Sequence, residues 1–387
     1  MSSFLKNFCF CCVVACVAAC GGGTSSDFDN PTALAIDSIN DRVFVFESNQ
    51  NIHVRTASTN KKLPDQPVLN SDDDADADLL DLVPQLTTQA VAYADGDETR
   101  LFLLGAHSSS SGTVLNQMTV LDFDGEDLSE AAFSPVTLTD GDEATDETQA
   151  VFVKMILDQD AGLIYILNST TAEIFTIDAT TGEAVGTPIA VAAEPVDMAL
   201  LGTQLFVCHA DADLADSVTV VNTDDDSLQT VTLGSPCQKI AVAQNDNGTV
   251  LAVRSASAQT VFLNHFNSDD LSLTPIATDE EGFTDGQLLS GAGITSSVSA
   301  LVLTANADAT ISGYFAELDG NVEFVTIAAD LSEFSHEKFS TTAINYSDGA
   351  ALLNDDGESS HVYFIADTGF LLSLENQDGD LDGELDH

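Results

Sequence analysis

Short strands with apolar residues at consecutive positions recur along this chain, and they constrain its fold more than any other feature. They are rich in Val, Ile, Leu, Phe and Thr, and they are flanked by residues typical of turns, namely Asp, Gly, Asn and Ser. The clearest are RVFVF (42–46), RLFLL (100–104), GLIYIL (162–167), QLFVC (204–208) and HVYFI (361–365). Alternate side chains of a strand point to opposite faces, so these strands are covered on both sides. Each must therefore lie between two other sheets.

A repeat of the length of one four-stranded blade is clearest between residues 172 and 243. Equivalent strands begin near Ile174, Val218 and Val261, at spacings of 44 and 43 residues. The stretch resembles the YVTN-type β-propeller repeat, in which a V-x-V strand, a polar turn and a second strand precede Gly-x-Pro and an inner strand. The matching residues are Val218, Val220, Asn222, Val231, Leu233, Gly234 and Pro236.

The sequence therefore predicts an all-β fold, a single β-propeller over residues 31–376 with seven blades of four antiparallel strands. The expected blades are 31–70, 84–137, 149–190, 195–233, 236–275, 287–328 and 340–376. Six or eight blades remain open, because 276–286 and 329–339 have the composition of long loops. A two-domain β-sandwich is the alternative fold. With 387 residues, 44% of them hydrophobic, the chain can bury a sizeable core.

The charge of the chain is strongly negative. It has 63 acidic and 10 basic residues, which gives a formal net charge of −53. Nucleic acid is excluded as a partner, because binding phosphates requires clustered Lys and Arg. The acidic residues gather in short runs such as SDDDADAD (71–78) and DGDEATDE (140–147). We interpret these runs as solvated loops that keep the protein soluble, with cation binding by some of them as the alternative.

The first 19 residues have the pattern of a bacterial lipoprotein signal peptide. Lys6 precedes an apolar run that is too short for a membrane-spanning helix of about 20 residues. The segment Val17-Ala18-Ala19-Cys20-Gly21 resembles the lipobox, which implies cleavage before Cys20 and a lipid anchor on it. An ordinary secretory leader is the alternative. Residues 20–30 are expected to form a flexible tether, and Gly21 implies sorting to the outer membrane.

Only two cysteines, Cys208 and Cys237, remain after the leader and the lipid-bearing Cys20. An oxidising compartment favours a disulfide between them. In a propeller, the end of the second strand of blade four and the start of the innermost strand of blade five lie on the same face. Two buried free thiols are one alternative, and metal or redox chemistry with His209 is the other.

Residues 377–387 are expected to form an acidic C-terminal tail. Oxygen ligands alternate there and a glycine, Gly383, follows them, as in the first part of a calcium loop. The segment resembles thrombospondin type 3 calcium repeats, and its candidate ligands are Asp378, Asp380, Asp382 and Asp386. The glutamate that completes an EF-hand would fall beyond His387. A frayed tail without calcium is the alternative, and no other cofactor is expected.

Two of the few basic residues, Lys154 and Lys239, fall in predicted innermost strands. If they point into the channel, they are candidate contacts for an anionic ligand. The alternative is local compensation of the negative charge, and the same interpretation applies to the arginines that flank strands: Arg42, Arg55, Arg100 and Arg254.

The chain has no G-x-S-x-G, H-E-x-x-H or glycine-rich phosphate motif, so no catalytic residue is predicted. The preferred interpretation is a monomeric, non-enzymatic lipoprotein of the cell envelope that binds or scaffolds a protein, a glycan or a cation. Fold analogy carries most of that preference. The first alternative is a hydrolase resembling bacterial lactonase propellers, and the second is an envelope-assembly lipoprotein.

Overall fold

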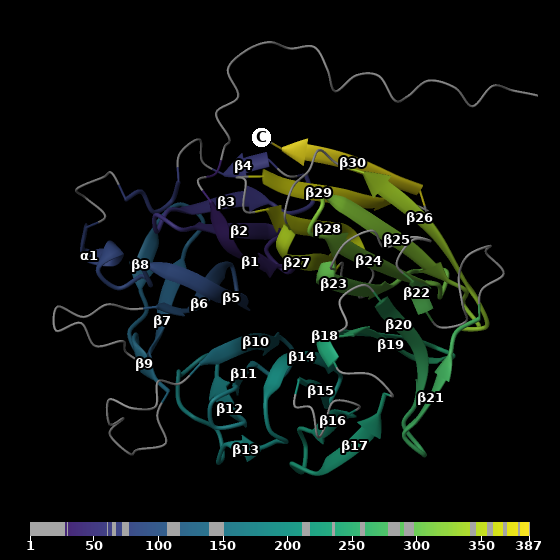
Figure 1. Cartoon of the computed structure of the whole chain (residues 1–387). Coiled ribbons are helices and arrows are strands. Elements are labelled where there is room, and N and C mark those ends of the chain that lie inside the picture. Colours follow the sequence, from purple (N-terminus) through teal and green to yellow (C-terminus); the bar gives the residue numbers. More distant parts are fainter. Residues whose placement is uncertain are drawn as a thin grey trace, which may run out of the picture.

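The chain forms a seven-bladed, all-β propeller, as the sequence predicts (Figure 1). Its computed structural model describes Phe28 and residues 30–386, apart from gaps at 60, 64–66, 72–76, 107–116, 139–150, 211–216, 234–236, 256–259, 278–286, 290–297, 341–345, 354–358, 367–369 and 378–379. Seven antiparallel sheets, here blades one to seven, follow one another in chain order around a central axis.

Each blade has four consecutive strands, of which the first lies innermost. The innermost strands are β1 (Pro31–Asp37), β5 (Leu86–Asp95), β10 (Phe152–Asp158), β14 (Pro195–Leu201), β18 (Cys237–Asn245), β23 (Val298–Ala305) and β27 (Tyr346–Leu353). The second strands are β2 (Arg42–Glu47), β6 (Glu98–Ala106), β11 (Leu163–Asn168), β15 (Gln204–His209), β19 (Gly248–Ser255), β24 (Ile311–Glu317) and β28 (Ser359–Ala366). Neighbouring innermost strands contact one another around the whole circle.

The outer strands complete the blades. The third strands are β3 (Ile52–Thr56), β7 (Gln117–Phe123), β12 (Glu173–Asp178), β16 (Ser217–Asn222), β20 (Thr260–Asn267), β25 (Asn321–Ile327) and β29 (Phe370–Gln377). The outermost strands are β4 (Lys61–Leu63), β8 (Leu128–Glu130) with β9 (Val136–Thr137), β13 (Ile189–Ala190), β17 (Leu228–Thr232), β21 (Ser272–Pro275) with β22 (Gln287–Leu289), β26 (Phe334–Ser340) and β30 (Asp380–Asp386). A short helix, α1 (Ala77–Leu80), lies between blades one and two in the sequence.

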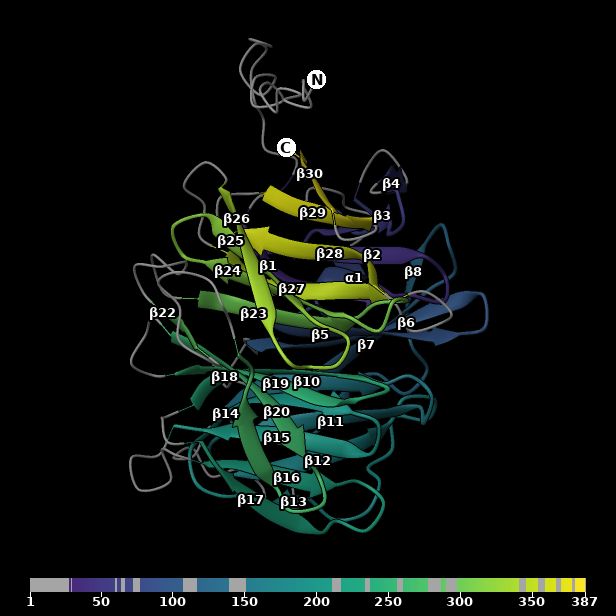
Figure 2. The ribbon, with the colours of Figure 1, turned by 90° about the vertical axis from the view of Figure 1, so that its right-hand side faces the viewer.

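The last two blades begin and end later than the sequence analysis expects. Residues 287–289 form β22, which pairs with β20 of blade five and does not open blade six. Blade six runs over 298–340 and blade seven over 346–386, so the outermost strand of blade seven, β30, comes from the expected tail (Figure 2). A segment of three residues such as Gln-Leu-Leu does not reveal which strand it pairs with, because tertiary contacts decide strand pairing.

The core consists of the interfaces between blades. In β2, Val43 packs in a cluster with Tyr363 of blade seven, while its neighbour Phe44 packs in a cluster with Leu101 of blade two. All four side chains are fully buried. Consecutive apolar residues thus serve opposite faces of one sheet, which explains the unbroken apolar runs in the sequence.

Blades one and seven close the circle by side-chain packing, because among the described residues no strand of one blade pairs with a strand of the other. Phe28, which precedes β1, packs in the cluster that joins these two blades. The guanidinium of the buried Arg55 lies 4.9 Å from the centre of the Phe28 aromatic ring. Tyr363 of blade seven donates a hydrogen bond to the carbonyl oxygen of Ala57. The junction therefore combines apolar burial with a hydrogen bond between the two blades.

Candidate functional site

Every innermost strand carries a β-bulge against its second strand, at an equivalent place in all seven blades. The residues that the pairing skips are Thr32, Thr88, Val153, Val196, Gln238, Ser299 and Ser347. A bulge re-aims the neighbouring side chains and increases the local twist. Because the bulge recurs at an equivalent place in each blade, the residues that follow it stand at one level around the axis.

We call the seven residues after the bulges the central ring. They are Ala33, Gln89, Lys154, Asp197, Lys239, Ala300 and Asp348. The innermost strands are otherwise largely apolar, so this level concentrates polar residues around the axis. The two lysines stand out in the sequence because cations are rare in this chain, but Gln89 and Asp197 do not. A usable signal existed, since in six of the seven strands the ring residue is the third residue.

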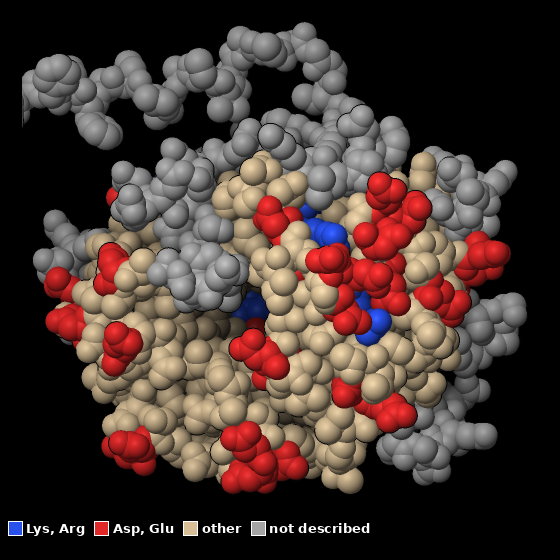
Figure 3. All heavy atoms as spheres, turned by 180° about the vertical axis from the view of Figure 1, so that it is seen from behind, with Lys and Arg blue, Asp and Glu red and all other residues tan. Residues whose placement is uncertain are grey.

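The two lysines of the central ring lie on innermost strands, which surround the central axis. Figure 3 shows one face of the molecule hollowed near its centre, with basic atoms deep inside. Lys154 and Lys239 are both half-buried, and no other Lys or Arg lies on the seven innermost strands. The structure thus places the two predicted residues in innermost strands two blades apart, with Asp197 on the blade between them.

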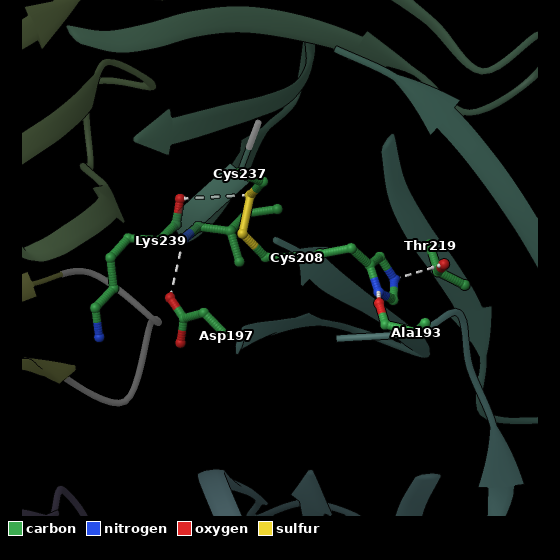
Figure 4. Close-up of a disulfide and its surroundings, with 8 residues drawn as sticks. Ala193, Asp197, Cys208, Thr219, Cys237 and Lys239 are labelled. Atoms are coloured by element: carbon green, nitrogen blue, oxygen red, sulfur yellow. Dashed lines mark hydrogen bonds between the residues drawn. A yellow bond between two sulfur atoms is a disulfide. The ribbon is translucent and has the colours of Figure 1, made fainter. Parts of the chain in front are cut away.

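Asp197 ties blade four to blade five. Its carboxyl group is almost fully buried, with 4% of the residue exposed. The backbone N–H of Ile240 donates a hydrogen bond of 3.0 Å to Asp197 Oδ2. Figure 4 shows this bond and, from the residue before Ile240, the Lys239 side chain extending away from the disulfide. The negative charge of Asp197 is therefore engaged by the backbone of the next blade.

Cys208 and Cys237 form a disulfide between blades four and five (Figure 4). Cys208 lies in β15 and Cys237 begins β18, with 5.4 Å between their Cα atoms. Both residues are fully buried. The disulfide thus adds a covalent link between blades four and five, next to the bulge that precedes Lys239.

His209 follows Cys208 in β15, so the two side chains point to opposite faces of the sheet. Its Nδ1 lies 3.1 Å from the carbonyl oxygen of Ala193, and its Nε2 lies 2.8 Å from Thr219 Oγ1. A carbonyl only accepts, so we assign the proton of the neutral ring to Nδ1. Within the described residues, no group of His, Cys, Asp and Glu could hold a metal ion.

The structure describes three of the five remaining predicted site residues. Cys20 and Asp378 lie outside the described residues. The other three candidate calcium ligands, Asp380, Asp382 and Asp386, belong to β30 and pair in register with β29. An extended strand differs from the predicted calcium loop, which requires a sharp turn around the ion. Calcium binding by these residues stays a prediction.

Several acidic residues of the surface loops hold their own turns. Asp178 Oδ1 accepts hydrogen bonds from the backbone N–H of Thr180 and of Thr181, at 2.8 and 2.9 Å. Hydrogen bonds to the ionised form lower the pKa of a carboxyl group. Hydrogen bonds from the side-chain hydroxyl or the backbone N–H of a nearby turn residue lower the pKa of Asp124, Asp178, Asp225, Asp270, Asp308 and Asp330. Part of the acidic surface therefore consists of aspartates that stabilise their own turns.

The fold and the central ring define a seven-bladed β-propeller with a polar level in its hollow, a fold that supports a binding or scaffolding role in general. No family model matches the chain, and no curated protein matches it. Among solved structures, hydrazine synthase of Kuenenia stuttgartiensis is similar with a TM-score of 0.44 and 14% sequence identity, over 64% of this chain and 68% of that chain. In the part of the chain that the structure describes, no helix is long and apolar enough to cross a membrane.

Proposed function

We propose that this protein is a non-enzymatic binding or scaffolding propeller of the bacterial cell envelope, anchored by lipid on Cys20, which contacts its ligand through the central ring. The central ring is the observation that carries the proposal. It places two lysines at one level of innermost strands that are otherwise largely apolar, in a chain with 10 basic residues. Polar groups that converge in a concave, mostly apolar surface are typical of ligand sites.

The envelope location rests on the first 26 residues. The short apolar leader, the lipobox-like Val17-Ala18-Ala19-Cys20 and the glycine-rich segment after it support a lipid anchor followed by a tether. The repeat that resembles the YVTN type supports an extracytoplasmic propeller that acts by binding. A protein or a glycan of the envelope is the proposed partner.

The anchor is tested by replacing Cys20 with serine. We expect the wild-type protein to incorporate labelled palmitate and to sediment with membranes, and Cys20→Ser to lose the label. An uncleaved leader can still hold the variant at the inner membrane, so density-gradient fractionation should accompany labelling. Cys16→Ser, which changes a leader cysteine, is the matched control and should label as the wild type does. Equal palmitate labelling of Cys20→Ser would contradict a lipid on this residue.

The binding role is tested with the full-length, lipidated protein in detergent-solubilised envelopes. We expect the wild type to capture one stable partner after cross-linking. The amount of partner captured by Lys154→Gln/Lys239→Gln should be lower by about tenfold or more. Lys61→Gln/Lys62→Gln removes the same charge from β4, an outermost strand, and should capture normally. Undiminished capture by the ring variant would contradict the proposal. So would a lactone hydrolysis rate that the ring variant abolishes, because that result favours the hydrolase.

A further inference from the structure

Buried cations in this protein generally have partners. Arg100 forms ion pairs with Asp95 and Asp122, the latter at 2.7 Å. Arg42 donates to Thr99 Oγ1 at 2.7 Å and to the carbonyl oxygen of Asp97 at 3.0 Å. With 63 acidic residues in the chain, counter-charges are plentiful. A basic side chain that has no such partner is therefore an exception that requires an explanation.

Lys239 and Arg254 are this exception. They are direct cross-strand partners in β18 and β19. Within the described residues, neither side chain has an ion pair or a hydrogen bond, although both are half-buried. The Nε of Arg254 is fully buried without a hydrogen-bond partner. Burial lowers the pKa of Arg254, and no acidic group acts against this effect.

The two cations share one face of blade five. Directly paired residues in adjacent antiparallel strands point to the same side of a sheet, with Cβ atoms about 5 Å apart. Two residues further along, Ala241 of β18 and Ala252 of β19 pack in the cluster between blades five and six. By alternation, Lys239 and Arg254 lie on that same face. Lys239 lies on an innermost strand and Arg254 on the next strand outward, and two like charges side by side destabilise the protein without a ligand.

The neighbouring carboxylates are engaged elsewhere. Asp197, on the blade-four side, accepts the backbone N–H of Ile240. On blade six, the fully buried Glu317 and Glu323 lie 3.6 and 3.0 Å from the ammonium of Lys338. These groups are bonded to other donors, so within the described residues none of them supplies a counter-charge to the pair on blade five.

We propose that Lys239 and Arg254 bind the oxyanion group of a small ligand that enters the central hollow. A guanidinium presents two parallel N–H donors to a carboxylate or phosphate, and an ammonium adds a point charge. The acidic surface repels anions, but charges beyond about 8 Å are largely screened at physiological salt, while a buried pair acts at contact distance. This inference rests on the proposed binding role and narrows it to a ligand class.

Calorimetry and thermal melting of the full-length protein in detergent, in a chloride buffer, test this site. The probes are succinate for a carboxylate and inorganic phosphate for a phosphate. We expect at least one probe to bind and to raise the melting temperature of the wild type. Lys239→Gln and Arg254→Gln should each weaken binding by about tenfold or more, and the double variant should abolish it. The probe that binds more tightly identifies the oxyanion.

Two controls separate binding from a structural role. Lys61→Gln removes one charge from the outermost strand β4 and should bind as the wild type does. Without probe, Lys239→Gln and Arg254→Gln should melt at or above the wild-type temperature, because each relieves an unfavourable pair. Failure of both probes to bind, or unchanged binding by the double variant, would overturn this site. Either result leaves the capture assay unaffected, because that assay measures recovery of a partner.

Discussion

Replacing Lys338 with methionine is expected to lower the free energy of unfolding by about 3 kcal/mol at pH 7, measured by urea denaturation. The ammonium of Lys338 lies 3.0 Å from Glu323 and 3.6 Å from Glu317, and both carboxylates are fully buried in blade six. Methionine fills a similar volume but leaves two negative charges without this cation. The expected loss lies at the lower end of the range for buried ion pairs that lose one partner, because 26% of the Lys338 side chain is exposed.

The loss should shrink as the pH falls towards 5. Burial raises the pKa of Glu323 above its ordinary value of 4.5, while the hydrogen bond and charge of Lys338 oppose that rise. A carboxyl group with a raised pKa binds more protons folded than unfolded, so its ionised form costs stability above the raised pKa. That cost disappears as the pH falls to the unfolded value. Without Lys338 the cost is larger, so the difference from the wild type should decrease with acidification.

A second substitution tests the cause. Adding Glu323→Gln to Lys338→Met removes one of the two uncompensated charges, and it should restore at least about half of the lost stability at pH 7. Glu337→Gln changes an exposed neighbour on the same strand and should stay within about 0.5 kcal/mol of the wild type. A Lys338→Met protein as stable as the wild type, or no recovery in the double variant, would show that Lys338 does not compensate these carboxylates.

The fold was predictable because a strand that is buried on both faces has apolar residues at consecutive positions. In RVFVF (42–46) the valines and phenylalanines serve different neighbouring blades, so the apolar run alone implies a sheet between two others. The errors fell where pairing partners decide the outcome. Gln287–Leu289 extends blade five, and Asp380–Asp386 becomes a strand although its Asp and Gly spacing favours a loop. Neither outcome follows from the residues of the segment itself.

The candidate site was only partly predictable. Lys154 and Lys239 were found by their rarity, but what places them at one level is a set of seven bulges, and a bulge is a property of pairing between strands. The pairing of Lys239 with Arg254 was missed for the same reason. The sequence alone presents Arg254 as one more compensating charge, and only the register of β18 and β19 reveals two adjacent cations.

Removing the disulfide with Cys208→Ala/Cys237→Ala should lower the free energy of unfolding by roughly 3.5 kcal/mol. The estimate follows from the entropy that a cross-link closing a loop with a sequence separation of 29 removes from the unfolded chain. At about 2 °C or more per kcal/mol for a domain of this size, the melting temperature should fall by about 7 °C or more. Differential scanning calorimetry of the oxidised wild type and the double variant measures both quantities.

Reduction provides the matched control, because it breaks the same bond without changing the sequence. Both cysteines are fully buried, so a reductant reaches them only when the two blades open locally. We therefore expect dithiothreitol to leave the native wild type largely oxidised, but to lower its transition once the protein has been unfolded and refolded in reductant. The double variant should not respond to reductant at all. If denatured, unreduced wild-type protein showed two titratable thiols, Cys208 and Cys237 would be free, and the stability of the junction between blades four and five would have to come from its apolar core and from the hydrogen bond between Asp197 and Ile240.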